Sequence, residues 1–281
     1  MAATSPTMRQ RELGRRLRDM RTDHNLTVED VAARLLCSAT KISRLETGTR
    51  PPSLRDVRDL CNLYEVDAAT SADLMSLARG AREQTWWTQY NDLKLDPYLG
   101  FEQDAVAITS YTTYVFPALL QTEDYARTVI KTIAPKMQPA ILQQRVEVRM
   151  LRQQVLEKAD APRYRVLLDE AVLHRHVGGS SVMAAQLDKV LKSASDKATI
   201  QVIPFGAGAL AAQDSNFIFF EFDDGSSTVF IEGLAGNNYH ERKADVTRYR
   251  ENIDNLRDSA LGPKDSIAYI AQIRDKVHET E

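Results

Sequence analysis

The sequence has little of what several classes of protein depend on. Its 281 residues include only two cysteines, Cys37 and Cys61, which argues against a disulfide framework and a cysteine-based metal centre. Both lie in apolar helical segments, so we expect buried free thiols. There is no run of about 18 apolar residues and no signal-peptide pattern, so we expect a cytoplasmic protein with no membrane partner.

The charge of the chain is unevenly distributed. The formal net charge is −3, yet residues 1–50 hold 10 Lys and Arg against 6 Asp and Glu, and the rest of the chain is net acidic. A positive end suits contact with nucleic-acid phosphates, and an acidic remainder weakens non-specific DNA binding. Some arginines on or before the first expected helix are candidates for phosphate contact, but most of them are interpreted as its solvated face. The set is Arg9, Arg11, Arg15, Arg16, Arg18 and Arg21.

Residues 26–48, LTVEDVAARLLCSATKISRLETG, have the pattern of two short helices joined by a tight turn. Thr27 is placed as the N-cap of the first helix and Ser38 as the N-cap of the second. The small side chain of Ala32 allows the two helices to cross closely. Gly48 ends the second helix as a left-handed cap. This spacing predicts a DNA-binding helix-turn-helix.

The outward face of the second helix carries the residues that we expect to read DNA bases. Core-facing positions leave five side chains there: Ala39, Thr40, Lys41, Ser43 and Arg44. In a helix-turn-helix this face enters the major groove, and Arg44 is the first candidate because a guanidinium pairs with guanine. Lys41 is left open between base and phosphate. Thr27 and Arg50 are expected to contact phosphate. The alternative is an ordinary solvated helix pair.

The turn between these helices departs from the usual pattern at one residue. A glycine commonly starts such a turn because its φ is positive, but this chain has Leu36 there. Leu36 must therefore adopt a strained backbone, or the turn must differ locally.

The region resembles the XRE family of helix-turn-helix regulators over about residues 8–80. Residues 26–48 fit helices two and three of that family without a gap, and RQRELGRRLRDMRTDHN and SLRDVRDLCNLYEV fit the flanking helices. The resemblance implies an all-α five-helix domain and base contacts from the outward residues of 39–44. It also implies a homodimer on an inverted repeat in double-stranded DNA.

We place the helix-turn-helix domain at residues 1–80 and a second domain at 81–281. Trp86 and Trp87 open the second part and are interpreted as packing anchors.

Beyond them, strands and helices mix, and Asp223-Asp224-Gly225 joins two strands as a hairpin turn. This composition predicts an α+β domain with a small, partly antiparallel sheet. Strands are expected near 106–116, 164–169, 199–205, 215–222 and 227–232, and helices near 122–134, 139–159, 180–195, 240–260 and 264–278.

The second domain resembles the C-terminal domain of WhiJ-like, antitoxin-like actinobacterial regulators over roughly residues 90–275. The segments that carry the likeness are FPALLQTEDYA at 116–126, LDEAVL at 168–173 and QVIPF at 201–205. The resemblance implies an actinobacterial source and a C-terminal domain that binds a small co-encoded protein or a small-molecule effector. It implies no particular chemistry.

Enzymatic interpretations have little support. His174 and His176 point about 200° apart on a helix, so they do not share a metal, and no Cys or His cluster supplies further ligands. The short glycine stretches match no phosphate-binding fingerprint. Arg145, Arg149 and Arg152 line one helix face, which is either solvated or paired, or else binds an anion. We therefore expect no catalytic residues, no metal and no cofactor.

The sequence thus predicts a sequence-specific transcriptional regulator. In this hypothesis a homodimer binds a palindromic operator, and the C-terminal domain is a sensing or protein-interaction module. One alternative is an antitoxin-like protein that mainly holds a small co-encoded partner and autoregulates its operon. The other is an enzyme tethered to DNA.

Overall fold

The computed structural model describes residues 5–93, 97–195, 197–210, 216–233 and 236–279. The chain divides into two compact units, Met1–Asp104 and Ala105–Glu281. Each unit is described by itself, and the boundary predicted between residues 80 and 81 stays a prediction. No helix within the described ranges is long and apolar enough to cross a membrane.

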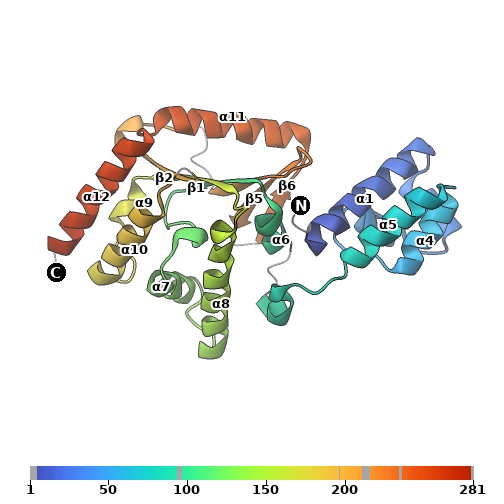
Figure 1. Cartoon of the computed structure of the whole chain (residues 1–281), viewed down its shortest axis with the longest axis horizontal. Coiled ribbons are helices and arrows are strands. Elements are labelled where there is room, and N and C mark those ends of the chain that lie inside the picture. Colours follow the sequence, from blue (N-terminus) through green and yellow to red (C-terminus); the bar gives the residue numbers. More distant parts are fainter. Residues whose placement is uncertain (1–4, 94–96, 196, 211–215, 234–235, 280–281) are drawn as a thin grey trace. The chain divides into compact units, whose positions relative to one another are not determined.

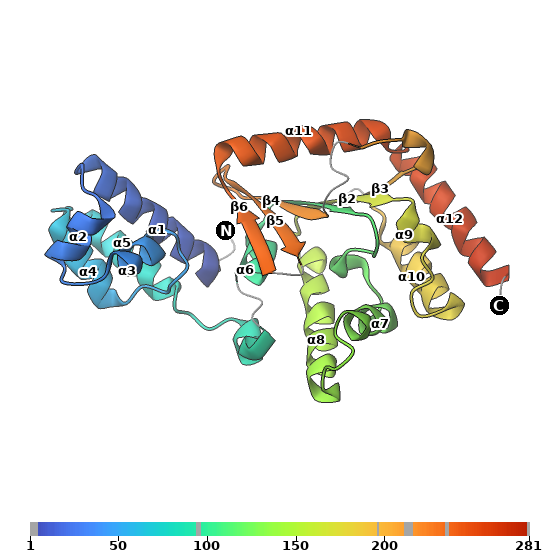
Figure 2. The ribbon, with the colours of Figure 1, turned by 180° about the vertical axis from the view of Figure 1, so that it is seen from behind.

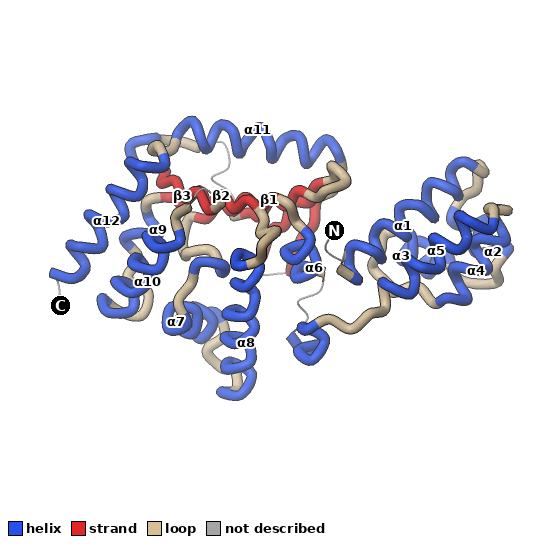
Figure 3. The backbone as a smooth tube through the Cα atoms, in the orientation of Figure 1, coloured by secondary structure: helices blue, strands red, loops and turns tan. Residues whose placement is uncertain are grey.

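The first unit is made of helices, as Figure 3 shows by colour. The five predicted helices are present, which confirms the all-α five-helix domain. The sequence did not predict a short 3₁₀ helix, η1, or the helix α6 that follows it. The elements are α1 (Pro6–Asp23), α2 (Val28–Arg34), α3 (Ala39–Glu46), α4 (Leu54–Leu63), α5 (Ala68–Gly80), η1 (Trp86–Leu93) and α6 (Tyr98–Asp104).

Each of the helices α1 to α5 begins after a residue whose side chain accepts a hydrogen bond from a backbone N–H in the first turn of the helix. Thr27 and Ser38 cap α2 and α3, as predicted. The other three caps are Ser5, Ser53 and Asp67. Such a cap contributes about 1 kcal/mol, so the chain specifies where each helix starts as well as which face it buries.

The core of the first unit is formed by one buried face from each of the five helices. α2 and α3 meet through Ala32 and Ile42, which are only 4% and 2% exposed. The other fully buried members are Leu13, Leu17, Val31, Leu45, Val57, Leu60, Cys61, Tyr64, Leu74 and Ala78. Both cysteines are free thiols, Cys61 buried and Cys37 half-buried. This shared core fixes the position of α3 relative to the other helices.

The second unit contains a six-stranded sheet in the order β3-β2-β1-β4-β5-β6. β1, β2 and β3 run parallel, and β4, β5 and β6 continue the sheet antiparallel from β1. The prediction of an α+β domain with a partly antiparallel sheet is confirmed, but β6 was not predicted. The strands are β1 (Ala107–Thr112), β2 (Arg163–Asp169), β3 (Ala198–Ile203), β4 (Phe217–Glu221), β5 (Ser227–Gly233) and β6 (Gly236–His240).

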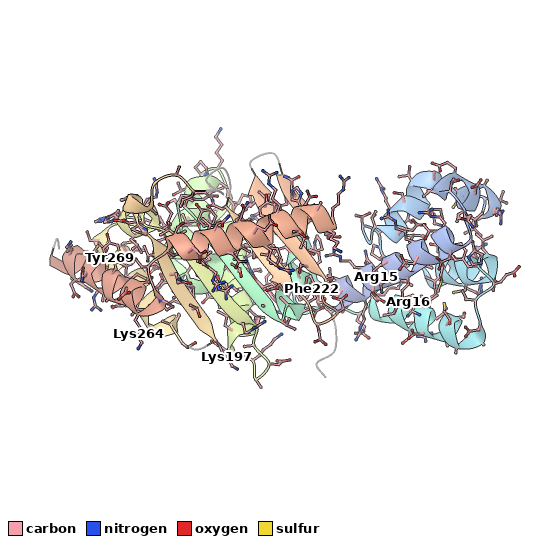
Figure 4. All side chains as sticks on the ribbon, turned by 90° about the horizontal axis from the view of Figure 1, so that it is seen from above. Arg15, Arg16, Lys197, Phe222, Lys264 and Tyr269 are labelled. Atoms are coloured by element: carbon pink, nitrogen blue, oxygen red, sulfur yellow. The ribbon has the colours of Figure 1, made fainter. Side chains whose placement is uncertain are left out.

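Helices cover both faces of this sheet (Figures 1 and 2). One face carries α7 (Glu123–Ile133), α8 (Pro139–Arg152), α9 (Ala171–His174) and α10 (Ser180–Ser193). The opposite face carries α11 (Lys243–Ser259), and Figure 4 shows it lying across the strands. α12 (Pro263–Glu279) packs against α10 and β3. All six residues of β1 are consequently buried, which explains why its sequence is not alternately polar and apolar.

Packing against α11 fills the core on its side of the sheet. Ile253 and Leu256 of α11 contact the buried strand residues Tyr111, Leu167, Ile203, Phe217, Phe219 and Val229. The Tyr111 hydroxyl lies in this core without a hydrogen-bond partner. A buried hydroxyl that forms no hydrogen bond lowers stability, so Tyr111 stabilises this core through the packing of its ring.

Three tyrosines of the second unit should make it sensitive to alkali. The pKa is raised to about 12 for Tyr111 by burial and the nearby Asp169 charge, and for Tyr125 by burial. The Tyr269 pKa is also raised to about 12, through the hydrogen bond of its hydroxyl to Glu170. Because an unfolded tyrosine ionises near pH 10, we expect the contribution of these tyrosines to stability to be constant below about pH 10 and to fall between about pH 10 and 12.

Urea unfolding at a series of pH values measures this fall, and Tyr111→Phe provides the comparison. The variant lacks one of the three ionising groups and also the hydroxyl without a partner. Its free energy of unfolding should therefore match or exceed that of the native chain at pH 8 and fall less steeply above about pH 10. Parallel curves for the two chains would contradict the role given to Tyr111.

Candidate DNA-binding surface

The start of α2 is fixed by a reciprocal pair of hydrogen bonds. The Thr27 hydroxyl accepts from the backbone N–H of Asp30 at 3.1 Å, and the Asp30 carboxylate accepts from the backbone N–H of Thr27 at 2.9 Å. The Thr27 hydroxyl also donates to that carboxylate at 2.7 Å. These bonds to Thr27 lower the pKa of the exposed Asp30. Thr27 is exposed where the prediction needs it, but its hydroxyl already has a partner, which a phosphate would have to displace.

The turn between α2 and α3 has the strained backbone that the sequence predicts. Leu36 has a φ of 50°, in the left-handed region that glycine adopts without penalty. The backbone N–H of Cys37 bonds to the carbonyl of Ala32 at 2.9 Å, so the turn closes tightly in spite of the leucine. The first of the two expectations for this turn, strain at Leu36, is therefore confirmed.

α3 presents a polar outward face. Ser38 caps it by accepting from the N–H of Lys41 at 3.2 Å, and Ile42, Leu45 and Glu46 are buried on its inner side. Four of the predicted base-reading residues remain on the outer side: Thr40, Ser43 and Arg44 are exposed, and Ala39 is half-buried. Small side chains around one arginine leave room for the helix to approach base edges in a major groove.

Lys41, the fifth predicted base-reading residue, points toward α4. Its ammonium contacts the Asp56 carboxylate of α4 at 2.6 Å, and both side chains are largely shielded, at 29% and 18% exposed. Burial alone would raise the Asp56 pKa, but the hydrogen bonds from Lys41 and Ser53 outweigh it and lower the pKa. The structure therefore gives Lys41 a second role, in which it holds α3 against the first turn of α4.

A buried ion pair fixes the other end of α3. The Arg21 guanidinium donates to both carboxylate oxygens of Glu46, at 2.7 and 3.0 Å, and to the carbonyl of Leu26 at 2.7 Å. The side chains are 12% and 6% exposed. Arg21 thus connects the end of α1 to the end of α3 and to the residue before the α2 cap. The sequence predicted a solvated face for most of the six arginines in this region, and Arg21 is not part of such a face.

Other arginines of α1 are also paired. Arg9 contacts Glu83 at 2.7 Å, Arg15 contacts Glu12 at 2.9 Å, and Arg16 contacts Asp73 at 2.5 Å. Figure 4 labels Arg15 and Arg16 on α1. These guanidiniums bind within the unit, which reduces the positive charge that α1 offers to phosphate.

Cations near α3 instead come from the segment that follows it. Arg50 is exposed just after the left-handed Gly48, whose φ is 62°, and its backbone N–H bonds to the Arg44 carbonyl at 3.3 Å. Arg55 and Arg58 on α4 have side chains that are 82% and 62% exposed, and both contact Asp59 only at 3.6 Å. Neither arginine was predicted from the sequence, although both lie in the first turns of the helix that Ser53 caps.

The segments that carry the WhiJ-like resemblance form hydrogen bonds within the second unit. Within LDEAVL, the Glu170 carboxylate accepts from the Tyr269 hydroxyl at 2.5 Å and from the backbone N–H of Phe205 at 2.7 Å. His174 lies 3.2 Å from the same carboxylate. Burial would raise the Glu170 pKa, but these bonds lower it overall. Tyr269 lies on α12 (Figure 4), so Glu170 connects the ends of β2 and β3 to that helix.

The segment FPALLQTEDYA is held by a buried network of amides. The Gln121 side chain donates to the Phe116 carbonyl at 2.6 Å and accepts from Arg149 at 3.0 Å. Gln186 donates to the Leu120 carbonyl at 2.7 Å and accepts from the N–H of Thr122 at 2.8 Å. Arg149 is thus bound within the protein, and Arg152 is buried. This favours the paired interpretation for Arg149 and excludes a solvated face for Arg152, whereas the Nε atom of Arg145 is buried without a hydrogen-bond partner among the described residues.

Two family matches cover most of the chain. Residues 12–74 match the helix-turn-helix domain family. Residues 95–272 match a domain of unknown function, DUF5753. No curated protein matches the chain.

The helical fold, the exposed face of α3 and the first match together define a DNA-binding regulator of the helix-turn-helix class. The chain belongs to the DUF5753 family, whose domain covers more than half of its length. Neither match names the XRE or WhiJ-like groups, so those finer resemblances stay predictions.

Proposed function

We propose that this protein is a homodimeric transcriptional regulator that recognises a palindromic operator through α3. The observation that carries the proposal is the outer face of α3, where Thr40, Ser43 and Arg44 are exposed while both ends of the helix are fixed by ion pairs. A rigidly held helix with free polar side chains is what direct readout of bases requires. The resemblance to XRE regulators supports the dimer and the inverted repeat.

Selection of genomic fragments tests this function directly. The purified full chain is incubated with sheared DNA at about 0.15 M salt, where weak phosphate binding is suppressed, and the retained fragments are sequenced. We expect an enriched motif with two symmetric halves whose centres lie about one DNA turn, or a multiple of it, apart. Enrichment of a single unrepeated motif would contradict the dimer, and an even spread of fragments would contradict sequence-specific binding.

Arg44→Ala is the sharpest test of base reading. The guanidinium is exposed on the outer face of α3, so its removal should leave the fold intact. We expect a loss of about 1–3 kcal/mol in binding to the selected site and a much smaller loss on random DNA. Fluorescence anisotropy on both DNAs measures the two affinities. Equal losses on both would make Arg44 a phosphate contact.

Arg58→Ala is the matched control for Arg44. It also removes an exposed guanidinium, from α4 instead of α3. We expect it to weaken binding to both DNAs alike, with no preference for the selected site, and to reduce the salt dependence of binding.

For the second unit we propose a sensing or protein-interaction role and no catalysis. Its family has no assigned function, and the carboxylate of Glu170 is occupied by hydrogen bonds within the unit. The antitoxin-like alternative rests on the WhiJ-like resemblance, which implies a small co-encoded partner. Co-purification with the products of the neighbouring genes, followed by DNA-binding assays with and without them, tests both. DNA affinity that no such protein or cell extract alters would contradict the sensing role.

A further inference from the structure

The turn of the helix-turn-helix carries a feature that does not stabilise the fold. Leu36 is 95% exposed, the highest value among the large apolar side chains of the described residues. A single exposed leucine is common in proteins, but this one also has a φ of 50°, where a side chain is strained. An exposed large apolar side chain and a strained backbone both lower the stability of the isolated chain. A residue that has both is a candidate for a contact with another molecule.

A cavity opens beside this leucine. It has a volume of about 250 Å³, and its apolar wall is made of Leu35, Leu36, Cys37, Ile42, Leu45 and Leu60. The other lining residues are charged, and the volume exceeds the about 150 Å³ that admits a benzene-sized group, so the cavity is large enough for a leucine side chain. A protruding leucine and a cavity that accepts one therefore lie on the same surface.

We infer that two copies of this chain meet through this surface, with Leu36 of each copy entering the cavity of the other. A twofold contact brings the same patch of both copies together, so a patch with both a protrusion and a matching cavity is complementary to itself.

The charges around the cavity favour a second copy. The charged residues of its wall are two cations and two carboxylates, which form the pairs Lys41–Asp56 and Arg55–Asp59. A balanced rim can face its own copy without like-charge repulsion, whereas a surface for DNA or an acidic partner would have a net positive charge.

The contact leaves the DNA-reading face free. Lys41 lines the cavity, but Thr40, Ser43 and Arg44 do not. Two leucines bury far less area than a stable interface needs, so the contact is weak between free copies. It gains strength where copies are already held close, as they are on one DNA, and this consequence alone rests on the proposed function.

Cross-linking of the full chain without DNA tests the inference, because the native Cys37 lines the cavity. A short bifunctional maleimide should join two copies through Cys37, since Cys61 is buried. Leu36→Gly removes the protrusion, and we expect its yield of covalent dimer to fall by at least about tenfold, because each dimer loses two buried leucine side chains. The same variant should melt at an equal or higher temperature because glycine tolerates the positive φ. Unfolding would then not explain the loss.

Two controls make the result decisive. Leu36→Met keeps an apolar side chain and should retain most of the yield. Ile133→Cys in a Cys37→Ser chain places a thiol at the next most exposed apolar residue, 70% exposed, and gives the yield from random collisions. Labelling with a monofunctional maleimide checks that Cys37 reacts equally in every variant that retains it.

A native yield no higher than that of the Ile133→Cys control would overturn the inference, as would an unchanged yield in Leu36→Gly. If Leu36→Gly instead weakens binding to a single operator half-site while cross-linking is unchanged, Leu36 contacts DNA and the inference is wrong. Because the cross-linking uses no DNA, a failure of operator binding leaves this result standing.

Discussion

Arg21→Met should destabilise the first unit by about 3–5 kcal/mol, because it leaves the buried carboxylate of Glu46 without its partner. The guanidinium also binds the Leu26 carbonyl, so the substitution disconnects three helices at one point. Most of a typical domain stability of about 5–15 kcal/mol would be lost. Chemical denaturation followed by circular dichroism measures the change.

Two further variants separate the charge from the packing. Arg15→Met removes a guanidinium that is 61% exposed and paired on the surface of the same helix, and we expect a loss of no more than about 1 kcal/mol. The double variant Arg21→Met, Glu46→Leu removes both buried charges and should recover much of the stability that the single variant loses. A double variant as unstable as Arg21→Met would show that packing, not the unpaired carboxylate, causes the loss.

Gly14→Ala should be the most damaging small substitution in the DNA-binding domain. A methyl group at Gly14 would lie 2.6 Å from the carbonyl oxygen of Leu45 and 2.7 Å from that of Glu46. These atoms belong to the backbone of α3, so relief requires the whole helix to move. We expect a net loss of about 3 kcal/mol, even though alanine favours a helix over glycine by about 1 kcal/mol.

The same substitution should weaken DNA binding beyond its effect on stability, because α3 carries the reading face. Arg18→Ala on the exposed side of α1 is the control and should change the melting temperature little. Melting curves and anisotropy titrations, run well below the melting temperature of each variant, distinguish the two effects. A Gly14→Ala chain with native stability would mean that α1 and α3 can separate without cost.

Local signals allowed much of the DNA-binding domain to be predicted from sequence. A Thr or Ser cap followed by an apolar stripe fixes where a helix starts and which side it buries, so Thr27, Ser38 and the core members of α2 and α3 were predictable. Leu36 was predictable as a strained residue because so few conformations can close that turn. Such inferences need only the residues within a helical turn of each other.

Interactions between distant residues were not predictable in the same way. Outward position on α3 suggested that Lys41 reads DNA, but its partner Asp56 is 15 residues away on another helix. Arg21 looked like one of six surface arginines because nothing near it in sequence marks Glu46 as its partner. In the second unit, the edge strand β6 has the polar sequence GNNYH, which carries no apolar pattern, and it forms a strand because β5 pairs with it.

For the second unit, the sequence predicted the fold class but not the roles of individual polar residues. Apolar strand segments and capped helices predicted the mixed sheet. α7 begins directly after its Thr122 cap, as expected. The roles of Glu170 and Gln121 came only from the folded chain, where each joins segments more than 25 residues apart. Polar residues in a family signature are ambiguous until their partners are known.

The two tryptophans have a consequence for experiments on the intact protein. Trp87 is 6% exposed and packs edge-on against Trp86, with ring centroids 5.5 Å apart, in the short helix η1. Because the sequence contains no other indole, the fluorescence emission of the whole chain reports on this one segment. A titration of the unlabelled protein with operator DNA or a candidate effector therefore reads a single, known location, and a shift in emission maximum means that this aromatic pair has changed its surroundings.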